Sequence, residues 1–134
     1  MRQQQASQSQ TEAIQAIASP QTSSRSERRK QIRLLCGSIA REFHPEKIVL
    51  FGSYASRQPR LDSDVDLLVV MPFKGSPFRQ AAVILGHVVR TVGVLPMDLL
   101  VRTPRQVQER MQMGDSFMRE IIERGKVMYE ADHA

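Results

Sequence analysis

The chain has 134 residues, which is enough for one domain with a sizeable core and too few for two ordinary domains. Hydrophobic residues make up 41% and charged residues 25%, fractions typical of a soluble globular protein. No apolar run approaches the roughly 20 residues that a membrane-spanning helix needs, and the polar start MRQQQASQSQ lacks the apolar centre of a secretory signal. A single cysteine excludes an internal disulfide and disfavours a cysteine-based zinc site, so we expect a cytoplasmic protein that contacts no membrane.

The formal net charge of +5 comes from the first part of the chain. Residues 1–60 contain ten Lys and Arg against four Asp and Glu, whereas residues 61–134 contain nine against ten. The densest basic cluster comprises Arg25, Arg28, Arg29, Lys30 and Arg33. Such a run is more often a solvated helix face than a binding site, and contact with an acidic partner is the alternative. Direct binding of nucleic acid ranks lower, because no aromatic residues are interleaved with the basic ones.

The N-terminal stretch differs in composition from the rest of the chain. Residues 1–25 are rich in Gln, Ser and Ala without a sustained period, which predicts a disordered or fraying arm ahead of a domain at 26–134. Apolar residues at helical spacing predict an amphipathic helix over 26–43, with Ser24 and Glu27 as a capping box at its start. The single cysteine, in the apolar stripe of this helix, is expected to be a core residue rather than a nucleophile.

Short apolar runs bounded by Pro, Gly and polar residues predict four strands. They are expected at residues 47–51, 64–71, 95–101 and 126–130. Helical segments separate the strands, which favours an α+β (α/β) fold with a small mixed sheet and helices packed on it. In such a fold, the acidic residues of the strands come to lie on neighbouring strands of one sheet.

Four helical segments are expected between these strands. One turn follows the first strand at 53–57. A helix at 78–92 has an apolar face comprising Phe78, Ala81, Ala82, Leu85, Val88, Val89 and Val92. His87 falls on its polar face and is given no role. The last two helices are marked by their caps: Thr103 with Gln106 before one, and Asp115 or Ser116 before the other, with Gly114 and Gly125 after them.

Two carboxylates begin the second strand. Asp64 and Asp66 are expected on one face, roughly 6 to 7 Å apart, because alternate residues of a strand point the same way. Their repulsion is on the order of 2 to 3 kcal/mol at an effective dielectric near 20, which a bound cation or protonation of one carboxylate would relieve. A third carboxylate, Asp98, is the only charged residue in the apolar third strand, where an unpaired buried charge is costly. The three carboxylates are therefore expected to converge.

The first strand leads directly into Gly52 and Ser53. Glycine allows a sharp turn and the close approach of a ligand to the backbone. Ser53 offers a hydroxyl and an N–H group at the start of a helical turn, where a phosphate is favoured. Carboxylate oxygens suit Mg²⁺, which takes a few carboxylates together with substrate phosphates. The combination favours metal-assisted phosphoryl or nucleotidyl transfer, whereas Asp-x-Asp alone could be a strand-start turn capped by Asp62 and Ser63.

The segment Gly52-Ser53, ten residues, then Asp64-Val65-Asp66 resembles the signature of the minimal nucleotidyltransferases of the DNA polymerase β superfamily. The resemblance covers about residues 28–130 and implies a polymerase-β-like nucleotidyltransferase fold. It further implies that Gly52 and Ser53 hold the nucleotide phosphates, that Asp64 and Asp66 bind two Mg²⁺ ions, and that Asp98 completes the site and helps to activate the incoming hydroxyl. Many members have Ala-Arg-Gly where this chain has Ala55-Ser56-Arg57, so Arg57 is expected to supply part of the phosphate contact.

Stand-alone members of this size resemble the antitoxins of two-gene bacterial toxin–antitoxin modules, whose partner is a helical HEPN-type ribonuclease toxin. This resemblance implies ATP as the substrate and transfer of AMP to a tyrosine hydroxyl of the toxin. Two alternatives stay open: a binding module that neutralises a partner by masking it, and an enzyme that modifies a small hydroxylated molecule such as an aminoglycoside. The preferred NTP and the formation of an oligomer are also left open.

Overall fold

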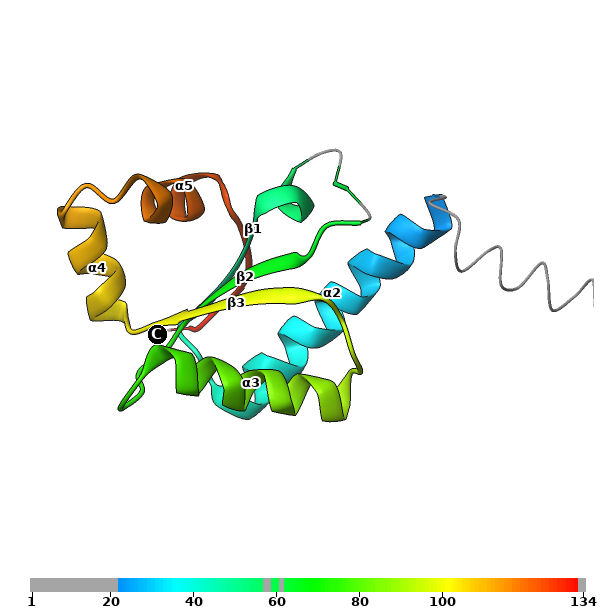
Figure 1. Ribbon diagram of the computed structural model, residues 1–134, viewed down its shortest axis with the longest axis horizontal. Coiled ribbons are helices and arrows are strands. Elements are labelled where there is room, and N and C mark those ends of the chain that lie inside the picture. The colour runs from blue at the N-terminus through cyan, green and yellow to red at the C-terminus, as the bar shows by residue number, and fades with distance from the viewer. Residues whose placement is uncertain (1–21, 57–58, 61, 133–134) are drawn as a thin grey trace, which may run out of the picture.

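The computed structural model describes residues 22–56, 59–60 and 62–132, which form one sheet with helices on both faces (Figure 1). Of the arm predicted at residues 1–25, residues 1–21 lie outside the described residues, and residues 22–25 are helical rather than disordered. In chain order, the elements are α2 (Thr22–Phe43), β1 (Lys47–Phe51), the 3₁₀ helix η1 (Gly52–Ala55), β2 (Val65–Val70), α3 (Pro77–Thr91), β3 (Met97–Arg102), α4 (Pro104–Gln112), α5 (Ser116–Arg124) and β4 (Lys126–Glu130). None of the described helices is both long enough and apolar enough to span a membrane.

The sheet has the strand order β3-β2-β1-β4. β1 runs antiparallel to β2 and to β4, whereas β2 and β3 are parallel. A parallel pair needs a crossover connection, and α3 provides it between β2 and β3. The predicted small mixed sheet in an α+β fold is therefore confirmed.

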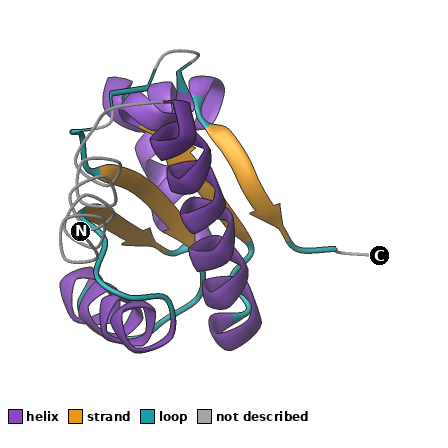
Figure 2. Ribbon diagram, turned by 90° about the vertical axis from the view of Figure 1, so that its right-hand side faces the viewer, coloured by secondary structure: helices purple, strands orange, loops and turns teal. Residues whose placement is uncertain are grey.

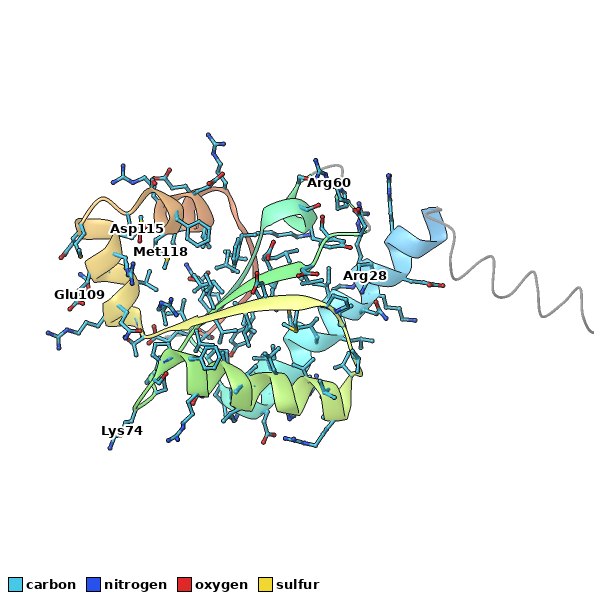
Figure 3. The ribbon with its side chains drawn as sticks, in the orientation of Figure 1. Arg28, Arg60, Lys74, Glu109, Asp115 and Met118 are labelled. Carbon is cyan, nitrogen blue, oxygen red and sulfur yellow. The ribbon has the colours of Figure 1, made fainter. Side chains whose placement is uncertain are left out.

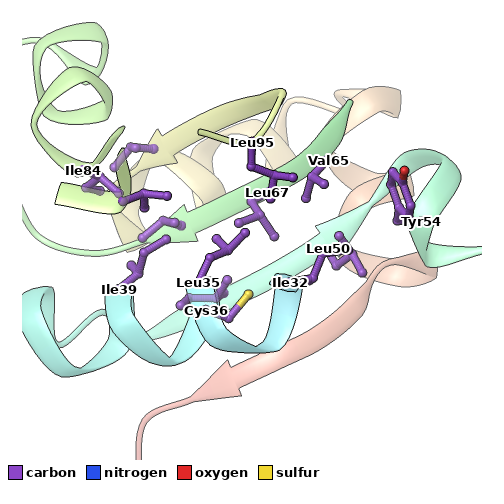
Figure 4. Close-up of a cluster of buried hydrophobic side chains, with 14 of the residues drawn as sticks. Ile32, Leu35, Cys36, Ile39, Leu50, Tyr54, Val65, Leu67, Ile84 and Leu95 are labelled. Atoms are coloured by element: carbon purple, nitrogen blue, oxygen red, sulfur yellow. The ribbon is translucent and has the colours of Figure 1, made fainter. Parts of the chain in front are cut away.

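Successive residues of β2 pack into two separate cores. Val65, Leu67 and Val69 belong to the core that the sheet forms with α2 and α3, part of which is drawn in Figure 4. Leu68 and Val70 belong to the core on the opposite face, under α4 and α5. A shift of one residue would bring every side chain of the strand to the wrong face, so burial on both sides fixes the register. Asp66 is thereby fixed on the face that α4 and α5 cover.

The helix α2 packs against the sheet as predicted, but it begins at Thr22 rather than at residue 26. Ser24 thus lies inside the helix, and its predicted place in a capping box is wrong. Polar residues are tolerated in the first turn of a helix, so a local capping pattern does not fix the start. Cys36 lies in the core, where burial raises the pKa of its thiol to about 12, and its predicted structural character is confirmed.

The apolar face predicted for α3 is partly wrong. The buried side chains of this helix are Ile84 and Val88, whereas Phe78 is 84% exposed and Val89 is also exposed. α3 packs against α2 as well as against the sheet, so its buried stripe is turned relative to the face expected for a helix that lies on a sheet alone. Periodicity indicates that a helix is amphipathic, but the partner elements decide which residues are covered.

His87 has a packing role that the sequence pattern did not indicate. Its ring lies edge-on to Phe43, with ring centroids 5.5 Å apart, and its Nε2 atom lies 2.8 Å from Ser38 Oγ. Ser38 is buried and also lies within hydrogen-bond distance of Thr91 Oγ1, at 3.1 Å. These polar groups therefore join α2 to α3.

The caps predicted for the last two helices are confirmed. Thr103 Oγ1 accepts a hydrogen bond from the Gln106 N–H at 3.1 Å, and Gln106 Oε1 accepts one from the Thr103 N–H at 2.9 Å. Asp115 lies at the start of α5 beside Met118 (Figure 3), whose N–H donates to Asp115 Oδ1 at 3.0 Å. Arg110 Nη1 lies 3.3 Å from Asp115 Oδ2. Asp115 therefore fixes the start of α5.

We expect the contribution of Asp115 to stability to depend on pH. The Met118 N–H and, to a smaller extent, Arg110 hold the pKa of the Asp115 carboxyl below its ordinary value. A lowered folded pKa means that the stabilisation is fully present above the ordinary value of about 3.9 and is lost as the pH falls through the folded pKa. The loss of unfolding free energy caused by Asp115→Ala should therefore be larger at pH 7 than in strong acid.

Urea unfolding at neutral and acid pH measures this difference. Asp62→Ala, which removes an exposed aspartate of the loop before β2, is the matched control. An equal loss for Asp115→Ala at both pH values would contradict the expectation.

Candidate functional site

The mixed sheet places two of the predicted carboxylates side by side. Asp66 of β2 and Asp98 of β3 are direct partners in the parallel register. Side chains in register on adjacent strands point to the same face, about 5 Å apart, so both carboxylates lie on the face that α4 and α5 cover. The expectation that Asp98 is buried is wrong: β3 is an edge strand and Asp98 is exposed.

The electrostatics of Asp66 link all three predicted carboxylates. Burial raises the pKa of Asp66 above its ordinary value, and the nearby charges of Asp98 and Asp64 raise it further. Asp64 comes one residue before β2 rather than inside the strand. Because the negative charges of Asp98 and Asp64 act on Asp66, ionisation of Asp66 has an electrostatic cost that a bound cation would relieve.

Gly52 lies directly against the carboxylate of Asp66. The backbone of Gly52 has φ +71°, a conformation that favours glycine, and a Cβ atom at this position would collide with Asp66 Oδ2. The sequence predicted that the missing side chain would leave room for a ligand. In the structure, that room is occupied by the Asp66 carboxylate, so the glycine positions a site residue.

Ser53 holds the segment that follows the turn. Its Oγ atom accepts a hydrogen bond from the Arg60 N–H at 2.7 Å, and its carbonyl oxygen accepts from the Ser56 hydroxyl at 2.7 Å. A serine hydroxyl that accepts one hydrogen bond still has its own hydrogen to donate. The donor that phosphate contact requires is therefore available on Ser53, while Arg57 falls outside the described residues.

A pocket of about 650 Å³ lies between the turn, the carboxylates and α5. Gly52, Asp66 and Asp98 form part of its wall. This volume is within the range of small-molecule sites, roughly 300 to 1,000 Å³. The pocket is therefore large enough for a nucleotide beside the carboxylates.

Helix α5 contributes residues to this pocket that sequence reasoning missed: Phe117, Glu120 and Arg124. Phe117 is 53% exposed and its ring lies edge-on to Phe51, with centroids 5.9 Å apart. The signal that could have identified them was the hydrophobic period of α5, which places Phe117, Glu120 and Arg124 at three- and four-residue spacing on one side of the helix. What the sequence did not reveal was that this side faces the carboxylates.

The carboxylates of the site can supply part, but not all, of the coordination of a Mg²⁺ ion. The described residues contain no group of three or more His, Cys, Asp or Glu side chains arranged to hold a metal ion. Mg²⁺ usually takes one or two carboxylates and completes its coordination with water and substrate phosphates, rather than occupying an all-protein cage. The adjacent carboxylates of Asp66 and Asp98 match this requirement, so the residues present fit a cation that binds together with a nucleotide.

The structure thus shows an α+β domain in which a mixed sheet places a Gly-Ser turn beside paired carboxylates. Residues 30–128 match the family model of the nucleotidyltransferase domain, and the chain belongs to this family. No curated protein sequence matches the chain. The matched segment runs from α2 into β4 and thus includes β1, β2, β3 and every residue that lines the pocket.

Proposed function

We propose that the chain is a Mg²⁺-dependent nucleotidyltransferase that transfers AMP from ATP to a hydroxyl group of a partner protein. We further propose that it is the antitoxin of a pair whose toxin is of the HEPN type. The observation that supports transfer chemistry is the register of Asp66 and Asp98, which face one pocket next to the Gly52 turn. Membership of the nucleotidyltransferase family supports an NTP as the substrate.

In this proposal, Asp66 and Asp98, with Asp64 beside them, hold the metal. Bound Mg²⁺ would neutralise phosphate charge and lower the pKa of the attacking hydroxyl. The raised pKa of Asp66 agrees with this assignment: burial raises it most, and the nearby negative charges of Asp98 and Asp64, which a bound cation would offset, raise it further. The side chain of Arg124, which lines the same pocket, supplies a positive charge for the phosphates.

The chain's own groups position the reactants. The Ser53 hydroxyl donates to a phosphate oxygen, and the exposed ring of Phe117 offers a surface on which the nucleobase packs. Asp98 accepts the proton of the acceptor hydroxyl while the oxygen of that hydroxyl forms a bond to the α-phosphorus of ATP. The bond between that phosphorus and the bridging oxygen of pyrophosphate breaks, and pyrophosphate leaves with the electron pair.

The proposal is tested by incubating the protein with α-labelled ATP, Mg²⁺ and the protein encoded beside it. We expect the label on the partner, no transfer when EDTA replaces Mg²⁺, and no label on the partner when ATP is labelled in the γ-phosphate. Mass spectrometry of the partner should place AMP on a tyrosine. A small helical neighbour with an Arg-x4-6-His motif would support the antitoxin assignment.

The same experiment separates transfer from masking. A variant with Asp64→Asn and Asp66→Asn should bind the partner yet fail to label or neutralise it. If this variant still neutralises the partner, transfer is unnecessary and the chain is a binding module. Absence of label on every protein partner, together with label on an aminoglycoside, would replace the protein acceptor by a small-molecule acceptor.

A further inference from the structure

A second pocket, of about 750 Å³, lies between α2 and β4 on the other side of η1 from the carboxylates. Figure 2 shows α2 crossing in front of the sheet, with β4, which leads to the C-terminus, beside it. The basic residues that line this second pocket are Arg25, Arg29 and Arg33 of α2 and Lys126 of β4. We call this pocket the basic groove.

The basic groove has an uncompensated positive charge. All four of its basic side chains belong to exposed residues, and none of them is in an ion pair with a described carboxylate. The described residues that line the groove include no Asp or Glu. The groove is therefore complementary to an anionic ligand.

The positive charges follow a regular line. Arg25, Arg29 and Arg33 are four residues apart on one helix, so neighbouring positions are about 6 Å apart along its axis. The floor between α2 and the sheet is apolar and includes Ile32, Leu50 and the half-buried Met128. A ligand that fits this groove combines several negative charges with apolar side chains, as an acidic peptide does.

A single-stranded nucleic acid fits the groove less well. Binding of this kind uses a series of exposed aromatic rings on which successive bases stack. Of the aromatic residues in the groove, Tyr54 is buried and Tyr129 is only partly exposed, and both lie apart from the arginine row on α2. The described lining thus provides charge for phosphates but little surface for bases.

The groove and the candidate site share a wall. Ala55 and Ser56, at the end of η1, line both the basic groove and the pocket that contains Asp66 and Asp98. A chain bound along α2 therefore ends close to the carboxylates. We propose that the basic groove binds an acidic segment of the acceptor protein and brings its hydroxyl to the site. The part of this proposal that identifies the bound segment as the acceptor rests on the proposed function. The part that says the groove binds an acidic peptide is independent of the proposed function.

The test is fluorescence anisotropy with a fluorescein-labelled peptide in which one tyrosine is flanked by glutamates, measured without nucleotide at low salt. The groove variant is Arg25→Glu, Arg29→Glu and Arg33→Glu. Its matched control is Lys74→Glu, Arg79→Glu and Arg90→Glu, which changes the net charge equally at exposed positions outside the groove. We expect the groove variant to bind the peptide at least about tenfold more weakly than the control, and binding by the original chain to weaken as salt rises.

Several outcomes would overturn the proposal. One is an equal loss of affinity in both variants, which would make the effect one of net charge alone. Another is a labelled oligouridine that binds more tightly than the peptide and depends on the same arginines, which would assign the groove to nucleic acid. A circular dichroism melt of each variant establishes that it is folded; should the triple variant unfold, the single changes Arg29→Glu and Arg79→Glu are compared instead.

Failure of this proposal is distinguishable from failure of the proposed function. Asp66→Asn should bind the acidic peptide like the original chain, because this residue lies outside the groove. Peptide binding that depends on the α2 arginines, without label transfer to any acceptor, supports the groove and overturns only the proposed function. The opposite result is a chain that does not bind the peptide but transfers label whether or not the α2 arginines are changed. That result would support the proposed function and overturn only the groove proposal.

Discussion

Replacing Asp66 by asparagine should abolish nucleotidyl transfer and, at neutral pH without divalent cations, make the folded chain more stable. Asn keeps the shape of the side chain but lacks the charge that a metal requires. Loss of a ligand that provides several kcal/mol of transition-state stabilisation corresponds to a rate at least about a thousandfold lower. The gain in stability has a separate cause, since the carboxylate of Asp66 is partly buried and repelled by Asp98 and Asp64.

The direction of the pH dependence follows from the raised pKa. In the folded chain, Asp66 holds its proton to a higher pH than in the unfolded chain, so the folded state binds more protons between the two pKa values. The penalty from this group is thus absent below the ordinary aspartate pKa of about 3.9 and grows as the pH rises through the folded value. Asp66→Asn should be more stable than the original chain at pH 7, and this advantage should shrink on acidification.

Thermal unfolding in EDTA at several pH values, together with the transfer assay, measures both effects. Asp62→Asn is the control, because it removes an exposed aspartate of the neighbouring loop. Added Mg²⁺ and ATP should stabilise the original chain more than the Asp66→Asn variant. A variant that keeps its transfer rate, or one that is less stable than the original chain in EDTA at pH 7, would contradict this account of the site.

Gly52→Ala should lower both stability and activity. A residue with a side chain costs roughly 1–2 kcal/mol in the left-handed conformation that Gly52 adopts. The new methyl group would also meet the Asp66 carboxylate, and overpacking of this kind typically costs about 1–3 kcal/mol. Either the turn or the carboxylate must move, and a displacement on the order of 1 Å can lower the rate about a hundredfold.

Gly114→Ala separates the two causes. Gly114 also has a positive φ, +78°, but a Cβ atom there would meet no described atom within 4 Å. We expect this control to lose only the backbone contribution and to keep its transfer rate. A double-mutant cycle of Gly52→Ala with Asp66→Ala should show that part of the stability loss disappears once the carboxylate is gone. Equal stability losses for Gly52→Ala and Gly114→Ala would mean that contact with Asp66 is unimportant.

Local patterns of the sequence predicted most of the elements. β1 and β4 have the predicted bounds, and the capping signals at Thr103 and Asp115 define the starts of α4 and α5. β2 and β3 differ from the prediction by one or two residues at their ends. These predictions succeed because strand burial and helix caps depend on residues that are close in the sequence.

Features that depend on distant residues were predicted less well. The rotation of α3 follows from its contact with α2, so a period within the helix did not reveal which side is buried. Phe117 and Arg124 reach the pocket only because α5 lies over the face of the sheet that bears Asp66. Motif spacing indicated the carboxylates and the turn, but it gave no information on the helix opposite them.

The position of β3 has a consequence for the dynamics of the site. Among the described residues, β3 is hydrogen-bonded to a strand on one side only, and it supplies Asp98. Edge elements open by local fluctuations that cost less free energy than global unfolding. Hydrogen exchange should thus be faster for amides of β3 than for those of β2, and each opening would dismantle the carboxylate pair while the central strands stay folded. Site integrity is in this sense a local equilibrium, one that a bound nucleotide can shift without any change in the rest of the sheet.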